Sequence, residues 1–225
     1  MTAIGIATTE DRKESLERTL ESLIDQKAVI YVHADYPEQE KRSNVIWVHI
    51  DNRLGDARKF YSYCMNEGKH ETWLFCDDDL IYPKDYVSTC EAHALNRDAV
   101  FSFHGRSIKE RPLKWPKVSY YRNSRIEGFR CLGEVKKFHQ VAPNGTLGTG
   151  VMFFRSGVLN LTWDMFKSKN MADIWLAKFA IEQGREMVVV PHKEGWINHI
   201  YNKKNIFEYH QFNDEEQTKL YNSIK

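Results

Sequence analysis

The chain has 225 residues, of which 42% are hydrophobic and 28% are charged, and its formal net charge is +1. This length and apolar content predict one domain with a sizeable core and argue against long disorder. The near-neutral balance excludes a protein that binds polyanions over its whole surface.

Four cysteines are scattered along the chain, and none of them forms a CxxC pair. Such spacing argues against a zinc finger and favours buried, reduced thiols, with a disulfide pair as the alternative. The N-terminus lacks a signal-peptide pattern, and no apolar run approaches the roughly 20 residues of a membrane span. We therefore expect a soluble, cytoplasmic protein without a transmembrane segment.

Short apolar runs alternate with helical patterns through the first half of the chain. They predict strands at residues 3–7, 28–33, 45–50, 72–76 and 99–103. Leucines at helical spacing predict a helix after the first strand, and further helices are expected at 55–67 and 83–93. This rhythm indicates an α/β sandwich with a mainly parallel central sheet. In such a sheet, ligands bind at the carboxyl ends of the strands.

The rhythm breaks at residues 104–140, which we expect to be irregular, basic and aromatic. This segment has ten Lys and Arg but only three Glu, a local charge of +7 against +1 for the whole chain. The alternative is a solvated loop whose charge acidic neighbours balance. Regular structure then resumes with a strand at 150–154, a helix at 171–183, a strand at 187–190 and a last amphipathic helix up to Ile224.

Three consecutive aspartates, Asp77, Asp78 and Asp79, directly follow the fourth predicted strand. Adjacent carboxylates repel one another, and a hard divalent cation such as Mg²⁺ or Mn²⁺ relieves that repulsion. Because side chains alternate along an extended chain, we expect Asp77 and Asp79 to share a face and Asp78 to point elsewhere. The alternative is a solvated acidic turn, and other metal-dependent phosphoryl enzymes also place aspartates at strand ends.

Residues 73–83, with the sequence WLFCDDDLIYP, resemble the DXD segment of bacterial GT-A glycosyltransferases near the family 2 group. Three further segments resemble that group in the same order. They are residues 6–9 with Arg12, residues 52–60 and residues 171–177. The resemblance spans roughly residues 3–190 and implies a GT-A fold, with a mainly parallel sheet flanked by helices.

The resemblance also implies roles in holding the donor. Thr8 would contact the nucleoside, and Asp35 would contact the base, typically uracil. Asp77 would hold the ribose or donor sugar and the metal, together with Asp79. The chain departs from the group in one respect, since residues 33–35 read HAD where two acidic residues are usual. The simpler alternatives are an N-cap role for Thr8 and a turn-forming role for Asp35.

Five other residues are candidates for the site. Arg58 and Lys59 are candidate phosphate contacts, with ordinary helix-surface cations as the alternative. Gly148 and Gly150 permit close approach of the backbone to a donor sugar, or simply form a turn. His192 is a candidate third metal ligand, because many GT-A folds recruit a late histidine, and His199 and His104 compete for that role.

Asp173 lies in the first turn of its predicted helix, where the helix dipole alone would favour a carboxylate. The resemblance implies that it deprotonates the acceptor hydroxyl in an inverting reaction. In a retaining reaction it would instead hold the acceptor or donor hydroxyls.

Together these features predict a metal-dependent glycosyltransferase with a nucleotide-sugar donor, most simply UDP-linked. We expect one domain, 1–225, with a nucleotide-binding half at 1–103, a basic aromatic acceptor segment at 104–148 and a catalytic half at 149–225. The charge of the middle segment suggests an anionic acceptor: a glycan, a lipopolysaccharide or a nucleic acid with hydroxylated bases. The alternatives are a nucleotidyl or phosphoryl transferase and a non-catalytic binding module. Sugar, acceptor, stereochemical course and oligomeric state stay open.

Overall fold

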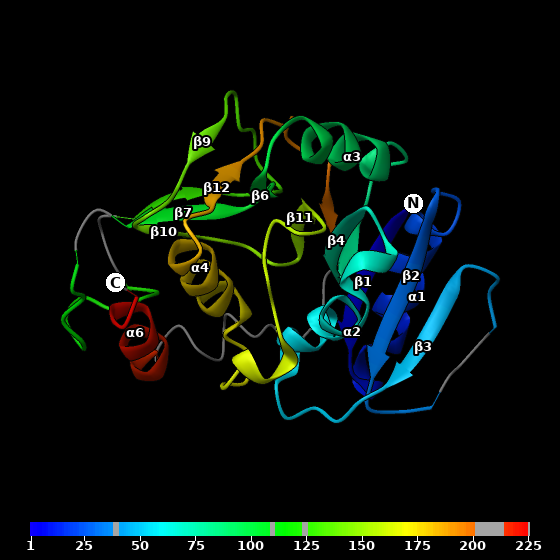
Figure 1. Ribbon diagram of the computed structural model, residues 1–225, viewed down its shortest axis with the longest axis horizontal. Helices are drawn as coiled ribbons and strands as arrows, with labels where there is room; N and C mark the ends of the chain where they lie inside the picture. Colours follow the sequence, from blue (N-terminus) through cyan, green and yellow to red (C-terminus); the bar gives the residue numbers. More distant parts are fainter. Residues whose placement is uncertain (38–40, 109–110, 123–125, 201–213, 225) are drawn as a thin grey trace.

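A central sheet of eight strands organises the computed structural model, which describes residues 1–37, 41–108, 111–122, 126–200 and 214–224. Helices cover both faces of the sheet (Figure 1). In spatial order the strands are β3 (Val45–His49), β2 (Ala28–Ala34), β1 (Thr2–Thr8), β4 (Thr72–Asp77), β11 (Val151–Arg155), β6 (Ala99–Ser102), β12 (Glu186–Val189) and β9 (His139–Gln140).

Most of the sheet is parallel, as predicted. β1 pairs in parallel with β2 on one side and β4 on the other, β2 pairs in parallel with β3, and β6 with β12. β11 is inserted antiparallel between β4 and β6, and β9 closes one edge antiparallel to β12. The chain moves outward from β1 to β2 and β3 and returns to β4 on the other side of β1, so a topological switch point lies between β1 and β4.

The helices are short, and several are 3-10 turns. They are η1 (Glu10–Arg12), α1 (Lys13–Leu23), η2 (Gly55–Phe60), α2 (Tyr61–Asn66), η3 (Glu67–Lys69), α3 (Tyr86–Asn96), η4 (Trp163–Met165), α4 (Ala172–Glu182) and α6 (Glu215–Asn222). Within the described ranges, none has the length and apolar character needed to cross a bilayer.

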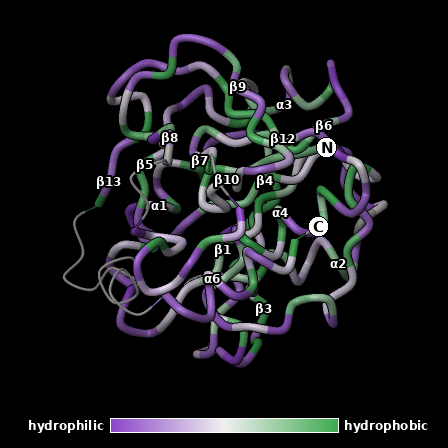
Figure 2. The backbone as a smooth tube through the Cα atoms, turned by 90° about the vertical axis from the view of Figure 1, so that its left-hand side faces the viewer, coloured by the Kyte–Doolittle hydropathy of each residue, from purple (hydrophilic) through white to green (hydrophobic). Residues whose placement is uncertain are grey.

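Alternation along the strands builds a separate core on each face of the sheet. In β4, Trp73 and Phe75 pack with α2 and α4, whereas Leu74 and Cys76 pack with α1 and α3. These side chains are almost fully buried, so each face removes a large apolar area from water. Figure 2 shows hydrophobic central strands and mostly hydrophilic outer loops.

Residues 104–140 are more ordered than the sequence suggested. They contain β7 (Gly105–Ile108) and β8 (Ile126–Phe129), which join β10 (Gly145–Leu147) in a three-stranded sheet at the end of the molecule away from β3 (Figure 1). These strands have only three or four residues and each contains a glycine, so they are too short to show a period-2 pattern, and their pairing depends on contacts distant in sequence. A further pair, β5 (Leu80–Ile81) with β13 (Asn198–His199), lies next to the aspartates.

Candidate functional site

The aspartate turn lies at the topological switch point of the sheet. Asp77 is the last residue of β4 and is opposite Ala7, one residue before the end of β1. Asp78 and Asp79 form the turn that leads into β5. The carboxyl ends of β1 and β4 therefore bring the opening loop and the acidic turn together, as the strand order requires.

A buried lysine and a glycine hold Asp77. Lys59 is 2% exposed, and its Nζ contacts Asp77 Oδ1. Burial raises the pKa of Asp77, but the charge of Lys59 and its hydrogen bond outweigh burial, so the pKa lies below its usual value. A methyl group added at Gly150 would lie 1.9 Å from Asp77 Oδ2. Gly150 is therefore needed for the close packing of the chain before β11 against this carboxylate.

Arg12 is shared by the other two aspartates. Its Nε lies 3.1 Å from Asp78 Oδ1, and its guanidinium also contacts Asp79. The structure turns Asp78 toward the interior, although Arg12 links it to Asp79; β4 ends at Asp77, so strand alternation does not extend into the turn. Asp78 is only 4% exposed, and burial raises its pKa to about 7 despite Arg12. Burial and the neighbouring Asp77 also raise the pKa of Asp79.

A histidine from late in the chain approaches Asp79, but it is His199 and not His192. The β5–β13 pairing brings His199 Nε2 to 3.6 Å from Asp79 Oδ2. The ring nitrogens of His192 lie 2.8 Å from the carbonyl oxygen of Val190 and 3.2 Å from that of Arg130, and the ring packs against Phe103. His192 thus anchors a loop, whereas His199 is the histidine that lies next to the aspartate turn.

The donor set suits a magnesium or manganese ion that has few protein ligands. Across the described parts of the chain, no group of three or more His, Cys, Asp or Glu side chains is arranged to hold a metal ion by itself. Asp77 and Asp79 offer carboxylate oxygens, which hard divalent cations prefer. Mg²⁺ is commonly bound through one or two carboxylates with substrate phosphates completing the shell, so two aspartates fit that pattern.

An open pocket of about 490 Å³ lies beside the end of β2. It is lined by Thr9, Glu10, Asp11, Asp35, Tyr36 and Asn52. Asp35, the predicted contact to the base, lines it, whereas Thr8, the predicted contact to the nucleoside, is buried and does not. The strand end, the opening loop and residue 52 therefore form one recess of a size suited to a nucleoside.

Arg58 and Lys59 are buried residues of the scaffold. Arg58 donates to the carbonyl oxygens of Thr8 at 2.8 Å and Gly55 at 3.1 Å, and its Nη1 lies 4.0 Å from Asp35. Its guanidinium thus fixes the opening loop next to the base pocket. Lys59 is paired with Asp77, so neither cation is presented to a phosphate as the sequence suggested, and neither is an ordinary helix-surface residue.

Asp173 faces the glycine-rich segment on the other side of the aspartate turn. It lies in the first turn of α4, and the Thr149 hydroxyl donates to its Oδ1 at 3.0 Å. His104 packs against Gly148, where an added methyl would lie 2.9 Å from the imidazole ring. Burial and Arg106 lower the pKa of His104 to about 4, although Asp173 and Asp77 oppose this. A neutral imidazole therefore lies close to both carboxylates at neutral pH.

Two residues of this cluster were not assigned roles from the sequence. Arg12 had been noted only as part of the opening segment, and Asp56 only as part of residues 52–60. A charged residue directly after a buried strand, as in the EDR of η1, was the available signal for Arg12. Nothing in the sequence indicates that Asp56 meets the start of α4.

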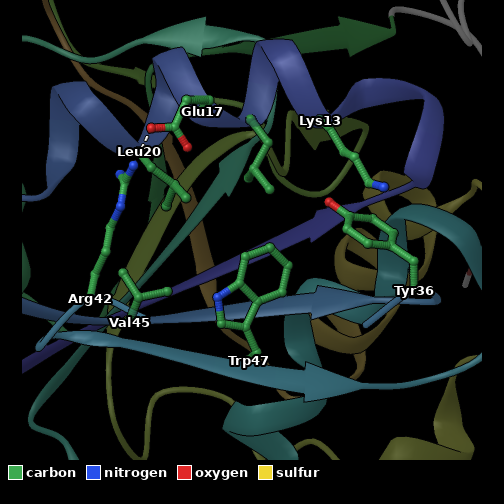
Figure 3. Close-up of a pocket in the computed structure, with 8 residues that line it drawn as sticks. Lys13, Glu17, Leu20, Tyr36, Arg42, Val45 and Trp47 are labelled. Atoms are coloured by element: carbon green, nitrogen blue, oxygen red, sulfur yellow. Dashed lines mark hydrogen bonds and ion pairs between the residues drawn. The ribbon is translucent and has the colours of Figure 1, made fainter. Parts of the chain in front are cut away.

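Another hollow, between α1 and the β2–β3 edge, is too small to be a ligand site (Figure 3). Leu16, Leu20, Val45 and Trp47 line it, and an ion pair between Arg42 and Glu17 closes one side. Its volume of about 30 Å³ is roughly that of one water molecule. The aspartate turn therefore remains the candidate site.

The fold around this site is that of a GT-A protein, as the sequence resemblance predicted. A solved structure of S. aureus TarS 1–349 in complex with UDP-GlcNAc superimposes with a TM-score of 0.55 at 12% identity, over 92% of this chain and 60% of that one. A second structure of S. aureus TarS 1–349 gives a TM-score of 0.52 at 15% identity, over 86% of this chain and 58% of that one. The chain thus spans about 60% of the length of the solved chains that it resembles.

Two further comparisons find nothing similar. No protein-family model matches the chain, and no curated protein matches it. At such low identity, the structural likeness defines the fold, and the function has to be argued from the site.

Proposed function

We propose that the chain is a metal-dependent glycosyltransferase that moves a sugar from a UDP-linked donor to an acceptor hydroxyl. The observation that carries the proposal is the grouping of Asp77, Asp79 and Asp173 with an open pocket at Asp35, all at the switch point of a GT-A fold. Within it, residues 1–103 would serve the nucleotide and residues 149–225 the acceptor.

On this proposal each part of the site has one task. The pocket at Asp35 holds the uracil and ribose, and Arg58 supports its edge through the Thr8 carbonyl oxygen and the Asp35 carboxylate. Asp77 and Asp79 hold Mn²⁺ or Mg²⁺, with His199 as a further donor within reach of Asp79. A bound cation would neutralise the charge that develops on the departing diphosphate. Asp173 accepts the proton of the attacking hydroxyl.

The test is release of the free nucleotide from a panel of UDP-, GDP-, dTDP- and CMP-sugars with Mn²⁺, beginning with UDP-GlcNAc because it is the ligand in the TarS complex. We expect slow hydrolysis of a UDP-sugar, which chelation of the metal abolishes. The Asp173→Asn variant should bind UDP normally in calorimetry and lose most turnover, because its side chain accepts no proton. Release of sugar 1-phosphate in place of the nucleoside diphosphate would instead indicate nucleotidyl transfer, and tight binding without turnover would indicate a binding module.

We also propose that the acceptor is anionic. Lys114, Lys117 and Lys137 are exposed, as are the rings of Trp115 and Phe138, at 41% and 52%. Two of the ten cations of residues 104–140 are already engaged within the fold. Arg106 stacks on Tyr120 and Tyr121, and Arg111 binds the end of α6. Lys109 and Arg125, which belong to the same set, lie outside the described residues. Exposed cations beside exposed aromatic rings suit a chain of sugars or bases that carries phosphates.

A further inference from the structure

The short helix η2 touches both halves of the candidate site. Near its C-terminal end, Lys59 contacts Asp77. Near its N-terminal end, Asp56 meets the start of α4, and the first turn of α4 contains Asp173. One six-residue element therefore connects the carboxylate on the donor side to the carboxylate on the acceptor side.

The contact between η2 and α4 is a joint of three polar interactions. The backbone N–H of Asp56 donates to Asn170 Oδ1 at 3.3 Å, and the backbone N–H of Asn170 donates to the carbonyl oxygen of Leu54 at 3.4 Å. The buried Asp56 carboxylate lies next to the backbone N–H of Ala172, the first residue of α4. The two segments are thus tied through both backbone and side chains.

The backbone at this joint is adapted to close approach. Gly55 has a φ of +59°, and a methyl group added there would lie 1.9 Å from Asn170 Oδ1. Asn170 is itself left-handed, with a φ of 55°, a conformation that Asn tolerates better than most residues. A side chain at position 55 would force the two segments apart.

Asp56 lies where α4 has no hydrogen-bond acceptor of its own, at the first N–H groups of the helix. The first N–H groups of a helix have no acceptor within the helix, and Met171, the N-cap residue of α4, provides no side-chain cap. The Asp56 carboxylate lies beside these N–H groups, from a segment more than 100 positions earlier in the chain. Its Oδ1 is buried without a hydrogen-bond partner among the described residues, and burial raises its pKa to about 7 despite Lys59. A carboxyl group buried at the start of a helix in this way indicates that its position beside α4 has a role.

We infer that Asp56 is a positioning residue, which caps α4 from across the fold and thereby fixes Asp173 relative to Asp77. This inference rests on the proposed function, in which Asp173 accepts the proton of the hydroxyl. A displacement of about 1 Å between reacting groups can lower a rate about 10²-fold, so the joint would control turnover without touching the substrate.

The test compares Asp56→Ala, Asp56→Asn and Asn170→Gly, with UDP release from the hydrolysed donor and Mn²⁺-dependent UDP binding as separate readouts. Asp56→Ala removes the cap, whereas Asp56→Asn keeps an oxygen that can accept from Ala172. Asn170→Gly removes the second contact and keeps a backbone that favours a positive φ. The matched control is Asp164→Ala, in the first turn of η4, whose carboxylate accepts from Thr162 in an exposed setting.

We expect Asp56→Ala and Asn170→Gly to lower kcat at least about tenfold with unchanged affinity for UDP, and Asp56→Asn to stay within about threefold of the wild type. The double variant Asp56→Ala/Asn170→Gly should have a kcat no lower than that of Asp56→Ala alone, because both substitutions break the same joint. Normal turnover in Asp56→Ala, or equal losses in Asp56→Ala and Asp56→Asn, would overturn the inference. Normal turnover in Asp173→Asn would instead overturn the role of Asp173 in the proposed function.

Discussion

At the scale of single residues, three adjacent aspartates with identical side chains have three different surroundings. Asp77 is paired with buried Lys59, which holds its pKa below the usual value. Asp78 is buried beside Arg12 with its pKa raised to about 7. Asp79 shares Arg12 and faces His199. The string DDD therefore provides two partly exposed carboxylates and one carboxyl group that belongs to the protein interior.

This difference predicts unequal effects of neutralising Asp78 and Asp79. Asp79→Asn should weaken Mn²⁺-dependent UDP binding more than about tenfold, because it removes a charged metal ligand. Asp78→Asn should change it little, because a carboxyl group whose pKa is about 7 is already partly protonated at neutral pH. Titration calorimetry with UDP and Mn²⁺ measures both. Equal losses in the two variants would show that Asp78 is also a ligand.

Gly150 offers a second test of the same site. Gly150→Ala should displace the Asp77 carboxylate, since the added methyl would lie 1.9 Å from its Oδ2. We expect Mn²⁺-dependent UDP binding to weaken about tenfold or more, because the ligand has to leave its place. Gly68→Ala is the control, since nothing lies within 4 Å of a methyl added there. Unchanged binding in Gly150→Ala would mean that Asp77 is free to rearrange without loss.

At the scale of elements, the accuracy of the sequence predictions follows from how locally each element is determined. The strands at 2–8, 28–34 and 72–77 are continuous apolar runs buried on both faces, and their predicted bounds agree with the structure within one residue. η2 was predicted as part of one long helix, but it winds as a 3-10 turn that buries residues 57–60 in succession. Such a turn is stabilised by tertiary contacts, which periodicity does not reveal.

His33 in β2 joins three elements and should make stability depend on pH. Its Nδ1 lies 3.0 Å from the carbonyl oxygen of Ile6 in β1, and its Nε2 lies 2.8 Å from Ser62 Oγ in α2. Burial lowers its pKa from 6.5 to about 4, so the unfolded chain binds a proton at a pH where the folded protein does not. The stabilisation is therefore complete above about pH 6.5 and is lost as the pH falls towards 4.

We expect this group to lower the free energy of unfolding by up to about 3 kcal/mol between pH 7 and pH 4. Urea denaturation across that range, compared with His33→Gln, measures the contribution as a difference in pH slope. His49→Gln is the control, because His49 is exposed at the end of β3. Identical slopes for the wild type and His33→Gln would show that another group governs the acid response.

At the scale of the whole molecule, the sequence identified which residues could act, and the fold decided which of them meet. The resemblance correctly indicated the GT-A fold, and it named Asp77 and Asp173, which the structure places on two sides of one site. It did not indicate that Lys59 would be buried under Asp77 or that His199 would approach Asp79 in place of His192. Those contacts depend on the β5–β13 pairing and on η2, which join segments far apart in the chain.

The distribution of charge over the molecule leads to the last prediction. The chain carries only +1, yet Lys114 and Lys117 are exposed together beside Trp115 in a segment that has a large excess of cations. If that segment holds an anionic acceptor, binding should weaken steeply with salt, because each neutralised phosphate releases counterions. Two phosphate contacts predict about a tenfold loss of affinity between roughly 0.05 M and 0.2 M salt.

Fluorescence anisotropy with a labelled single-stranded oligonucleotide and with a labelled phosphorylated glycan measures this loss for two kinds of anionic chain. The double variant Lys114→Ser/Lys117→Ser should bind the preferred probe more weakly, with a shallower salt dependence, and should bind UDP as the wild type does. Lys27→Ser/Lys41→Ser removes the same charge from exposed positions outside the segment and should leave probe affinity unchanged. If salt and both double variants leave the affinity of each probe the same, the acceptor does not bind through these lysines, and the excess charge of residues 104–140 serves only to solvate the surface.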